Sequence, residues 1–431
     1  MRKVAGSVAL ITAVISTTAL ATNGDNMIGV SPASRAMGGL GTGICLEPTD
    51  SIFRNPGWLA RQKGFNLSFG GILFMPHVKG RSKGYWDTND NDDTTGVIPV
   101  DSGYQSSDAN FFTIPEIAIT NQINDKVVLG LGAYGVSGMG VDYRDKTGLN
   151  KMHTSLQFMR FVPAIGYKVN EKLAIGGALH LAWGSLDLGA MMAYDNDGDG
   201  VPGTLWNASG GQSQSYGIGA SFGVNFKPLD SVCLGAYYQS SIKMKYKNVF
   251  DSNADGNFED LKLEQPQEFS VGVGFRPIPE FKFGFDVRWI NWSDADGYKQ
   301  FKWKDQWVFA VGGEYKATPR LALRAGYNYA KSPIRGKSNL DTVNRDNTVP
   351  DFDGRFSDYE IEWFNLIGFP AIAEHHLTCG FGYQFTENFE VNVSYVHAFE
   401  KKVESTAMGG ALLAGAKNSQ DSIGVSLDWH F

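Results

Sequence analysis

The chain has 431 residues, a net charge of −7, 42% hydrophobic residues and three cysteines. The negative charge argues against a nucleic-acid partner. No apolar run beyond the N-terminus approaches the roughly 18 residues that a membrane helix requires. Cys45, Cys233 and Cys379 are too widely spaced for a metal or redox motif, so unpaired structural thiols are expected.

Residues 1–21 have the pattern of a secretory signal peptide. Arg2 and Lys3 carry positive charge, residues 4–15 are apolar, and Ala19-Leu20-Ala21 is a small-residue cleavage motif. An uncleaved anchor helix is disfavoured because the apolar core is too short. The pattern predicts export across an inner membrane, with residue 22 as the first of the mature chain.

Residues 22–64 differ from the rest because their apolar residues do not alternate with polar ones. The segment is rich in glycine and proline, which predicts turns and short helices. Ahead of a barrel, such a segment would either hang in the periplasm or fill the lumen. Because the glycines allow close packing, we expect a hatch, or plug, inside the lumen.

Residues 65–431 predict an all-β fold, a transmembrane antiparallel β-barrel. In the last ten residues, Ile423, Val425, Leu427, Trp429 and Phe431 alternate with small or polar residues. Alternation with aromatic ends gives one lipid-facing and one lumen-facing side. The last strand must pair with the first, because hydrocarbon cannot satisfy an open strand edge.

About fourteen strands are predicted, an even number as bacterial single-chain barrels require. Short turns alternate with long polar connections, which places the turns in the periplasm and the loops outside the cell. The predicted spans are 65–78, 108–123, 126–138, 156–169, 173–189, 212–227, 231–248, 266–276, 280–292, 304–317, 320–330, 374–385, 388–402 and 419–431.

Strand parity assigns lumenal side chains. Arg160 and Arg324 both have the parity of inward-facing residues. An inward arginine is a candidate for binding the carboxylate of a ligand. An ion pair with Glu314 or Asp286 in the lumen is at least as plausible for either arginine.

The third predicted strand is irregular because Gly135, Gly138 and Gly140 interrupt it around Ser137. Glycines inside a strand indicate a bulge, a kink or the close approach of another backbone. A kink in a barrel wall can open a gap at its side. The alternative is a loose extracellular end of the strand.

Two acidic loops match the D-x-[DN]-x-[DN]-G start of a calcium loop. Position twelve is Trp206 in one and Lys262 in the other, so neither has the usual glutamate. Calcium needs about six to eight oxygen ligands, and Glu259 could supply more. A solvated polar loop is the alternative. The candidate ligands are Asp195, Asp197, Asp199, Asp251, Asn253 and Asp255.

The longest loop, residues 331–373, contains an apolar and aromatic stretch at 361–370. Such a stretch either packs against neighbouring loops or forms a hydrophobic landing site for a ligand, and the two are compatible. Its candidate capture residues are Trp363, Phe364, Leu366 and Phe369.

The mature chain resembles the FadL/TodX outer-membrane channels along essentially its whole length, most specifically in the hatch pattern that ends at Asn55-Pro56. The matching segments are Ala21-Thr22-Asn23-Gly24-Asp25-Asn26, Ser34-Arg35-Ala36-Met37-Gly38-Gly39, Arg54-Asn55-Pro56, Leu179-His180-Leu181-Ala182-Trp183-Gly184, Pro266-Gln267-Glu268-Phe269-Ser270, Trp289-Ile290-Asn291-Trp292-Ser293 and Glu374-His375-His376.

This resemblance implies an outer-membrane channel for long-chain fatty acids or other hydrophobic compounds. It implies capture at the extracellular face, an internal pocket, movement of the hatch and lateral exit at Gly135, Ser137 and Gly138. By the same analogy Asn23, Met27 and Ile28 would contact the pocket. Arg160 and Arg324 remain the candidates for a ligand carboxylate.

Other functions remain open. A channel for hydrocarbons or aromatic compounds would need no charged contact. A general porin is disfavoured by the hatch, and a calcium-dependent adhesin would use the acidic loops. No arrangement of Ser, His and Asp places a nucleophile beside a base, so no enzyme is expected. We expect a monomer with no required cofactor, in contact with outer-membrane lipid and lipopolysaccharide.

Overall fold

The computed structural model describes residues 23–89, 96–194 and 201–431. The predicted signal peptide, residues 1–21, therefore lies outside the described residues, as do Asp195, Asp197 and Asp199. Among the residues described, no helix is long and apolar enough to cross a bilayer.

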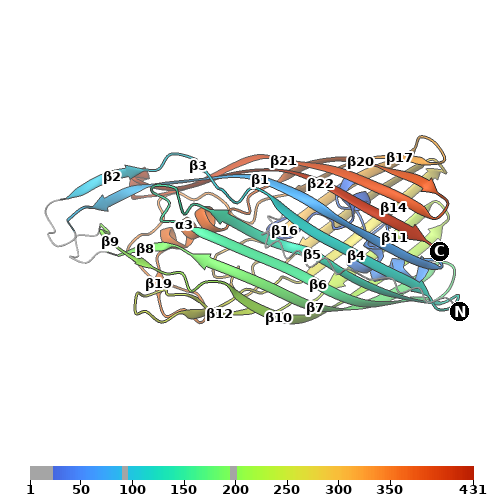
Figure 1. Cartoon of the computed structure of the whole chain (residues 1–431), viewed down its shortest axis with the longest axis horizontal. Coiled ribbons are helices and arrows are strands. Elements are labelled where there is room, and N and C mark those ends of the chain that lie inside the picture. Colours follow the sequence, from blue (N-terminus) through green and yellow to red (C-terminus); the bar gives the residue numbers. More distant parts are fainter. Residues whose placement is uncertain (1–22, 90–95, 195–200) are drawn as a thin grey trace, which may run out of the picture.

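Within these residues fourteen strands form one closed antiparallel barrel, as predicted (Figure 1). Closure is made by β1, which pairs with β22 on one side and with β4 on the other. The barrel strands are β1 (Phe65–Asp87), β4 (Phe112–Gln122), β5 (Val127–Asp142), β6 (His153–Lys168), β7 (Leu173–Gly189), β10 (Ser213–Leu229), β11 (Val232–Gln239), β14 (Glu268–Ile278), β15 (Phe281–Ile290), β16 (Gln306–Lys316), β17 (Leu321–Ala330), β20 (His375–Thr386), β21 (Phe389–Ala407) and β22 (Leu412–His430).

Period-two alternation explains the wall. On β7, Leu179 and Leu181 are 42% and 41% exposed, whereas His180 between them is fully buried. The same alternation sends Phe269 and Val271 outward on β14. The result is an apolar outer belt and a polar lumen, the arrangement that lipid on one side and a filled interior on the other require.

The strands extend further than predicted at the extracellular end. β1 and β21 continue to residues 87 and 407, and β22 begins already at residue 412, all beyond the predicted spans. There they are joined by smaller elements (Figure 1). These are β2 (Val97–Asp101), β3 (Gln105–Ser106), β8 (Met191–Tyr194), β9 (Thr204–Asn207), β12 (Lys245–Phe250), β13 (Glu259–Lys262), β18 (Asn347–Thr348), β19 (Arg355–Phe356), α3 (Asp358–Gly368) and η2 (Met408–Gly410).

The predicted strand 231–248 is wrong in its second half. The barrel strand β11 ends at Gln239, and residues 245–250 form β12 in a separate hairpin with β13. Alternation persists here, but Ile242 and Met244 pack inside the wall against Gly217, where a Cβ would lie 2.7 Å from their atoms. Period two therefore identifies a strand without saying which sheet it joins.

The hatch fills the lumen, not the periplasm (Figure 1, blue). It contains α1 (Pro32–Ala36), α2 (Asp50–Phe53) and η1 (Pro56–Arg61). The Asp286 carboxylate on β15 accepts hydrogen bonds from the backbone N–H groups of Gly41, Thr42 and Gly43 at 2.9, 2.8 and 3.0 Å. These three charge-assisted bonds hold the glycine-rich turn against the wall.

Candidate inner ligand site and lateral opening

The barrel wall is interrupted between β4 and β5. Their pairing runs from Gln122↔Val128 to Glu116↔Tyr134 and stops there. Backbone hydrogen bonding to β5 resumes where the Asp108 N–H, ahead of β4, donates to the Asp142 carbonyl at 3.0 Å. Between these points, no backbone hydrogen bond joins β4 to β5 in the part of the chain described. The edge of β5 from residue 135 onward is thus free to pair with something else.

A bulge in β5 produces this interruption. Gly135 pairs with Met159 and Ser137 with Phe158, so Val136 is the extra residue. A Cβ on Gly135 would lie 2.5 Å from Ile114 Cγ2, so glycine is required for this close approach. Beyond the bulge β5 pairs regularly with β6 to residue 142, so this is an interior kink and not a loose strand end.

The start of the hatch occupies the edge that β4 leaves. The Met27 N–H donates to the Val136 carbonyl at 3.0 Å, and the Gly138 N–H donates to the Asp25 carbonyl at 3.1 Å. Gly24, at φ +67°, lies so close to Trp292 that a Cβ would be 2.5 Å from its ring. Residues 24–27 therefore close the inner side of the gap as a short pairing segment.

Behind this segment lies a small charged site. Its free volume is about 10 Å³, roughly the space of one water. Arg288 and Arg54 approach the Glu268 carboxylate at 3.1 and 3.8 Å. The remaining lining residues are Asn26, Met27, Phe53, Val136, Arg160 and Gln239.

Arg160 is the cation of this site without a carboxylate partner in the described residues. It is 3% exposed, donates from Nη1 to the Gln239 amide oxygen, and lies 5.5 Å from the Phe158 ring. Within the described ranges, its Nε has no hydrogen-bond partner. The lining thus holds three arginines against one glutamate, a surplus of two positive charges. Buried cations of this kind are costly unless an anion joins them.

Burial shifts the pKa values of two charged residues that the hatch places near this site, Arg54 and Asp25. Burial, together with the nearby Arg288 cation, lowers the pKa of Arg54 to about 9. Burial raises the pKa of Asp25 to about 7, although the Tyr298 hydroxyl donates to its carboxylate. With a pKa near 7 Asp25 is only partly ionised at neutral pH, so it carries less than a full negative charge there.

Arg324 is in a different environment from Arg160. Its Nε lies 2.8 Å from Glu314 and its Nη2 3.6 Å from Glu390. Lys282 lies 2.7 Å from the same Glu314. Two cations and two carboxylates balance, and Arg324 does not line the inner site. Arg324 is thus in the ion pair with Glu314 that was the predicted alternative, and it lies outside the inner site.

Of the other predicted ligand contacts, one lines the inner site and two do not. Met27 lines the inner site, and Asn26 beside it donates to Glu268 at 2.9 Å. Asn23 and Ile28 are buried in the hatch but do not line the site.

The predicted capture residues on α3 do not form an exposed surface. Phe364, Leu366 and Phe369 are at most 9% exposed, and Phe364 stacks on Phe301 with ring centroids 5.2 Å apart. Trp363 is half-buried and donates to Ser82 at 2.9 Å. Of the two predicted alternatives, packing describes this structure, because α3 folds into the barrel mouth (Figure 1).

The second acidic loop is closed by its own backbone. The Asp251 carboxylate accepts from the N–H groups of Ala254 and Gly256, and Glu259 accepts from Ser252. In the described ranges, no group of three or more His, Cys, Asp or Glu side chains could hold a metal ion. Calcium at Asp251, Asn253 and Asp255 stays a prediction.

Among the lining residues that the sequence did not assign to the inner site are Arg54, Gln239, Glu268 and Arg288. Arg54 is in the matched hatch motif and Glu268 in the Pro266–Ser270 motif, while Arg288 has inward parity. These signals were present, but nothing in the sequence brings the three side chains to one point. Register and hatch packing do so.

Comparisons with known proteins agree with the fold. The family model described as outer membrane protein transport protein (OMPP1/FadL/TodX) matches residues 8–358. Outer membrane protein P1 of Haemophilus influenzae is 21% identical, with 89% of this chain and 88% of that protein covered.

Solved structures share the architecture at low identity. A Pseudomonas aeruginosa FadL homologue has a TM-score of 0.70 at 17% identity, covering 94% of this chain and 99% of that one. The Pseudomonas putida toluene transporter TodX has a TM-score of 0.66 at 19% identity, with the same coverage. The chain belongs to the OMPP1/FadL/TodX family of outer-membrane transport proteins and is a β-barrel of the outer membrane.

Proposed function

We propose that this channel takes up hydrophobic compounds passively and that long-chain fatty acids are its preferred ligands. The observation that carries the proposal is the surplus of positive charge at Arg160, where the hatch start meets the interrupted wall. A fatty acid supplies one carboxylate for that surplus and an apolar chain for the surroundings.

An apolar route leads to the charged site. One contiguous cluster of buried apolar side chains includes Phe364 on α3, Phe369 at its end, Trp303, Trp292 and Met27. It continues to wall residues beside the gap, Phe112, Ile114 and Val141. Burial of each CH₂ group is favourable by about 0.8 kcal/mol, so an alkyl chain gains along the whole route.

The structure is a closed state. The inner site has about 10 Å³ of free volume, too little for an alkyl chain. Two backbone hydrogen bonds hold residues 25–27 on β5, whereas Asp286 and other wall residues anchor the glycine turn. We therefore expect the segment 23–28 to move on ligand binding while the rest of the hatch stays, which opens a path to the gap at Gly135–Gly138.

A channel for neutral hydrocarbons or aromatic compounds is the second candidate. The Glu268 carboxylate already neutralises part of the arginine charge. The region around α3 at the extracellular end contains stacked aromatic rings such as Phe301 and Phe364. The solved TodX is called a toluene transporter. In this case Arg160 would be a structural cation held by Gln239.

Competition binding separates the two candidates. Purified protein is titrated with a labelled long-chain fatty acid and with an alkane of similar length. We expect Arg160→Gln to weaken the fatty acid roughly 10- to 100-fold, because hydrogen bonds to charged groups contribute about 1.5–3 kcal/mol, and to leave the alkane unchanged. Arg324→Gln is the matched control, a buried lumenal arginine outside the site.

Three other outcomes would contradict the proposal. Binding of the alkane alone would make this a hydrocarbon channel. An equal loss for both ligands in Arg160→Gln would assign Arg160 a structural role. If neither ligand binds, a porin or an adhesin becomes the better explanation, and large single-channel conductance would distinguish the porin.

A further inference from the structure

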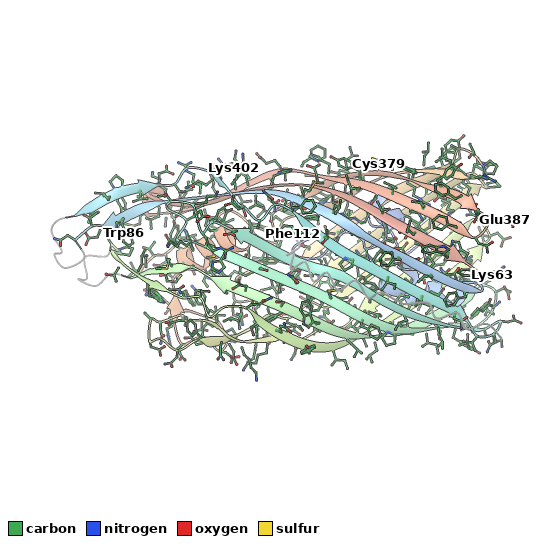
Figure 2. The ribbon with its side chains drawn as sticks, viewed as in Figure 1. Lys63, Trp86, Phe112, Cys379, Glu387 and Lys402 are labelled. Carbon is green, nitrogen blue, oxygen red and sulfur yellow. The ribbon has the colours of Figure 1, made fainter. Side chains whose placement is uncertain are left out.

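Three lysines lie side by side across the outer face of the wall. Lys79 on β1 pairs in register with Lys417 on β22, and Lys417 pairs with Lys402 on β21. Lys79 and Lys402 are exposed and Lys417 is partly exposed. Figure 2 shows Lys402 on the outer surface, between Trp86 towards the extracellular tip and the outward Cys379. We call Lys79, Lys417 and Lys402 the basic row.

This arrangement is unfavourable for the protein alone. Residues directly opposite on neighbouring antiparallel strands have Cβ atoms about 4.5–5.5 Å apart, and like charges there are destabilising. Glu404 lies 2.9 Å from Lys402, and Glu400 lies 3.7 Å from Lys417. Lys79 has no carboxylate within ion-pair distance in the part of the chain that the structure describes.

An ion pair and an aromatic ring adjoin the basic row. Arg81, two residues beyond Lys79, pairs with Asp101 at 2.6 Å. The Tyr104 ring lies among three cations, 4.9 Å from the Lys417 ammonium, 5.6 Å from that of Lys402 and 5.9 Å from the Arg81 guanidinium. Cation–π contacts with the Tyr104 ring thus hold these three cations close together on one face.

The basic row lies at the extracellular border of the lipid-facing belt. On the same strands Phe399, Tyr395 and Leu73 are 47%, 42% and 42% exposed, all on the periplasmic side of the row. Below the row, Glu400 lies beside Lys417, and Asp421 is engaged by His397 at 2.9 Å and His77 at 3.4 Å. A molecule that fits here has apolar chains for the belt and negative charge for the row.

We propose that the basic row binds the phosphate groups of a phosphorylated lipid in the outer leaflet. Phosphate oxygens accept hydrogen bonds from the ammonium groups of Lys79, Lys417 and Lys402, which relieves their mutual repulsion. The acyl chains lie along the exposed apolar side chains below. A soluble anion lacks the apolar part and gains nothing from that surface, so the position favours a lipid. The site is separate from the inner ligand site.

The test uses the full-length protein in detergent and native mass spectrometry. The probes are lipid A with both phosphates, the same lipid with its phosphates removed, and inorganic phosphate. The row variant carries Lys79→Gln, Lys402→Gln and Lys417→Gln. The control carries Lys126→Gln, Lys172→Gln and Lys316→Gln, which removes the same charge from exposed positions at the periplasmic end.

We expect the row variant to bind phosphorylated lipid A roughly a hundredfold more weakly than the natural protein, and the control to bind it unchanged. The dephosphorylated lipid should bind all three proteins equally. Equal affinity of row variant and control for phosphorylated lipid A would overturn the proposal. So would inorganic phosphate binding as tightly as the lipid, since it would show an anion site without lipid recognition.

Thermal unfolding shows whether the row variant is folded. In lipid-free detergent the row variant should unfold within a few degrees of the natural protein, because the loss of two exposed ion pairs is offset by the removal of repulsion between the lysines. Phosphorylated lipid A should raise the unfolding temperature of the natural protein and the control only. If the triple variant is unfolded, Lys79→Gln alone should weaken lipid A roughly fivefold; no change would count against the site.

Discussion

The two buried arginine clusters in the lumen differ in their balance of charge. Around Arg324, two cations face two carboxylates, and Glu314 touches both cations at 2.7 and 2.8 Å. Around Arg160, the lining holds three arginines and one carboxylate, that of Glu268, which pairs with Arg54 and Arg288 and not with Arg160. Both clusters are inward and buried. A balanced cluster is complete without a ligand, whereas a surplus indicates that an anion joins it.

The largest expected effect comes from removing the carboxylate of each cluster. Glu314→Gln and Glu268→Gln should each lower the free energy of unfolding in detergent by about 3–5 kcal/mol, because buried cations lose their partner. Denaturant unfolding measures both. A long-chain fatty acid should restore stability to Glu268→Gln, since its carboxylate replaces the missing charge, and should not restore Glu314→Gln.

The same two variants, Glu314→Gln and Glu268→Gln, can also contradict the proposed difference between the clusters. Rescue of both variants by the fatty acid would mean a non-specific effect of the ligand on the barrel. Rescue of neither would mean that the cluster around Arg160 does not receive a ligand carboxylate. Glu390→Gln, at the more distant and more exposed partner of Arg324, is the matched control and should cost less.

Asp25 is a buried acid in the hatch segment that pairs with β5. Burial raises its pKa to about 7 from 3.8, so the folded state holds the proton more tightly than the unfolded state. The stability that it contributes is fully present below about pH 4 and is lost as pH rises through about 7, by up to about 4 kcal/mol. Asp25→Asn should remove this dependence.

Denaturant unfolding at several pH values between about 4 and 8 measures the Asp25 contribution. The stability of the natural protein relative to Asp25→Asn should fall across this range. A constant difference would show that Asp25 is ionised throughout, which would reduce the charge surplus around Arg160. The comparison of the two clusters would then need one more carboxylate on the Arg160 side.

The smallest expected effect concerns a surplus of the opposite sign in the loop at 251–256. If calcium binds there with a Kd of about 1 mM, about 10 mM calcium should stabilise the protein by about 1.4 kcal/mol. Thermal unfolding with calcium and with magnesium measures this. The gain should be absent in Asp251→Asn. An equal gain in that variant would assign it to other sites.

Much of the architecture followed from local pattern. Period-two alternation predicts which residues face lipid and which face the lumen, because the two sides of a strand meet different environments. Short turns between long loops predict the two ends of the barrel. The glycine-rich start predicts a hatch, and the interior glycines predict the kink at Gly135. All of these are properties of neighbouring residues.

Charge balance was decided only by the tertiary structure. Parity places Arg160 and Arg324 inward alike, yet Glu314 and Glu390 reach Arg324 through strand register, while Arg54 joins the other cluster from the hatch. The same holds for the basic row, which exists only because Lys79, Lys417 and Lys402 share one register. Electrostatic partners are set by distance in space, and alternation along a strand says nothing about that distance.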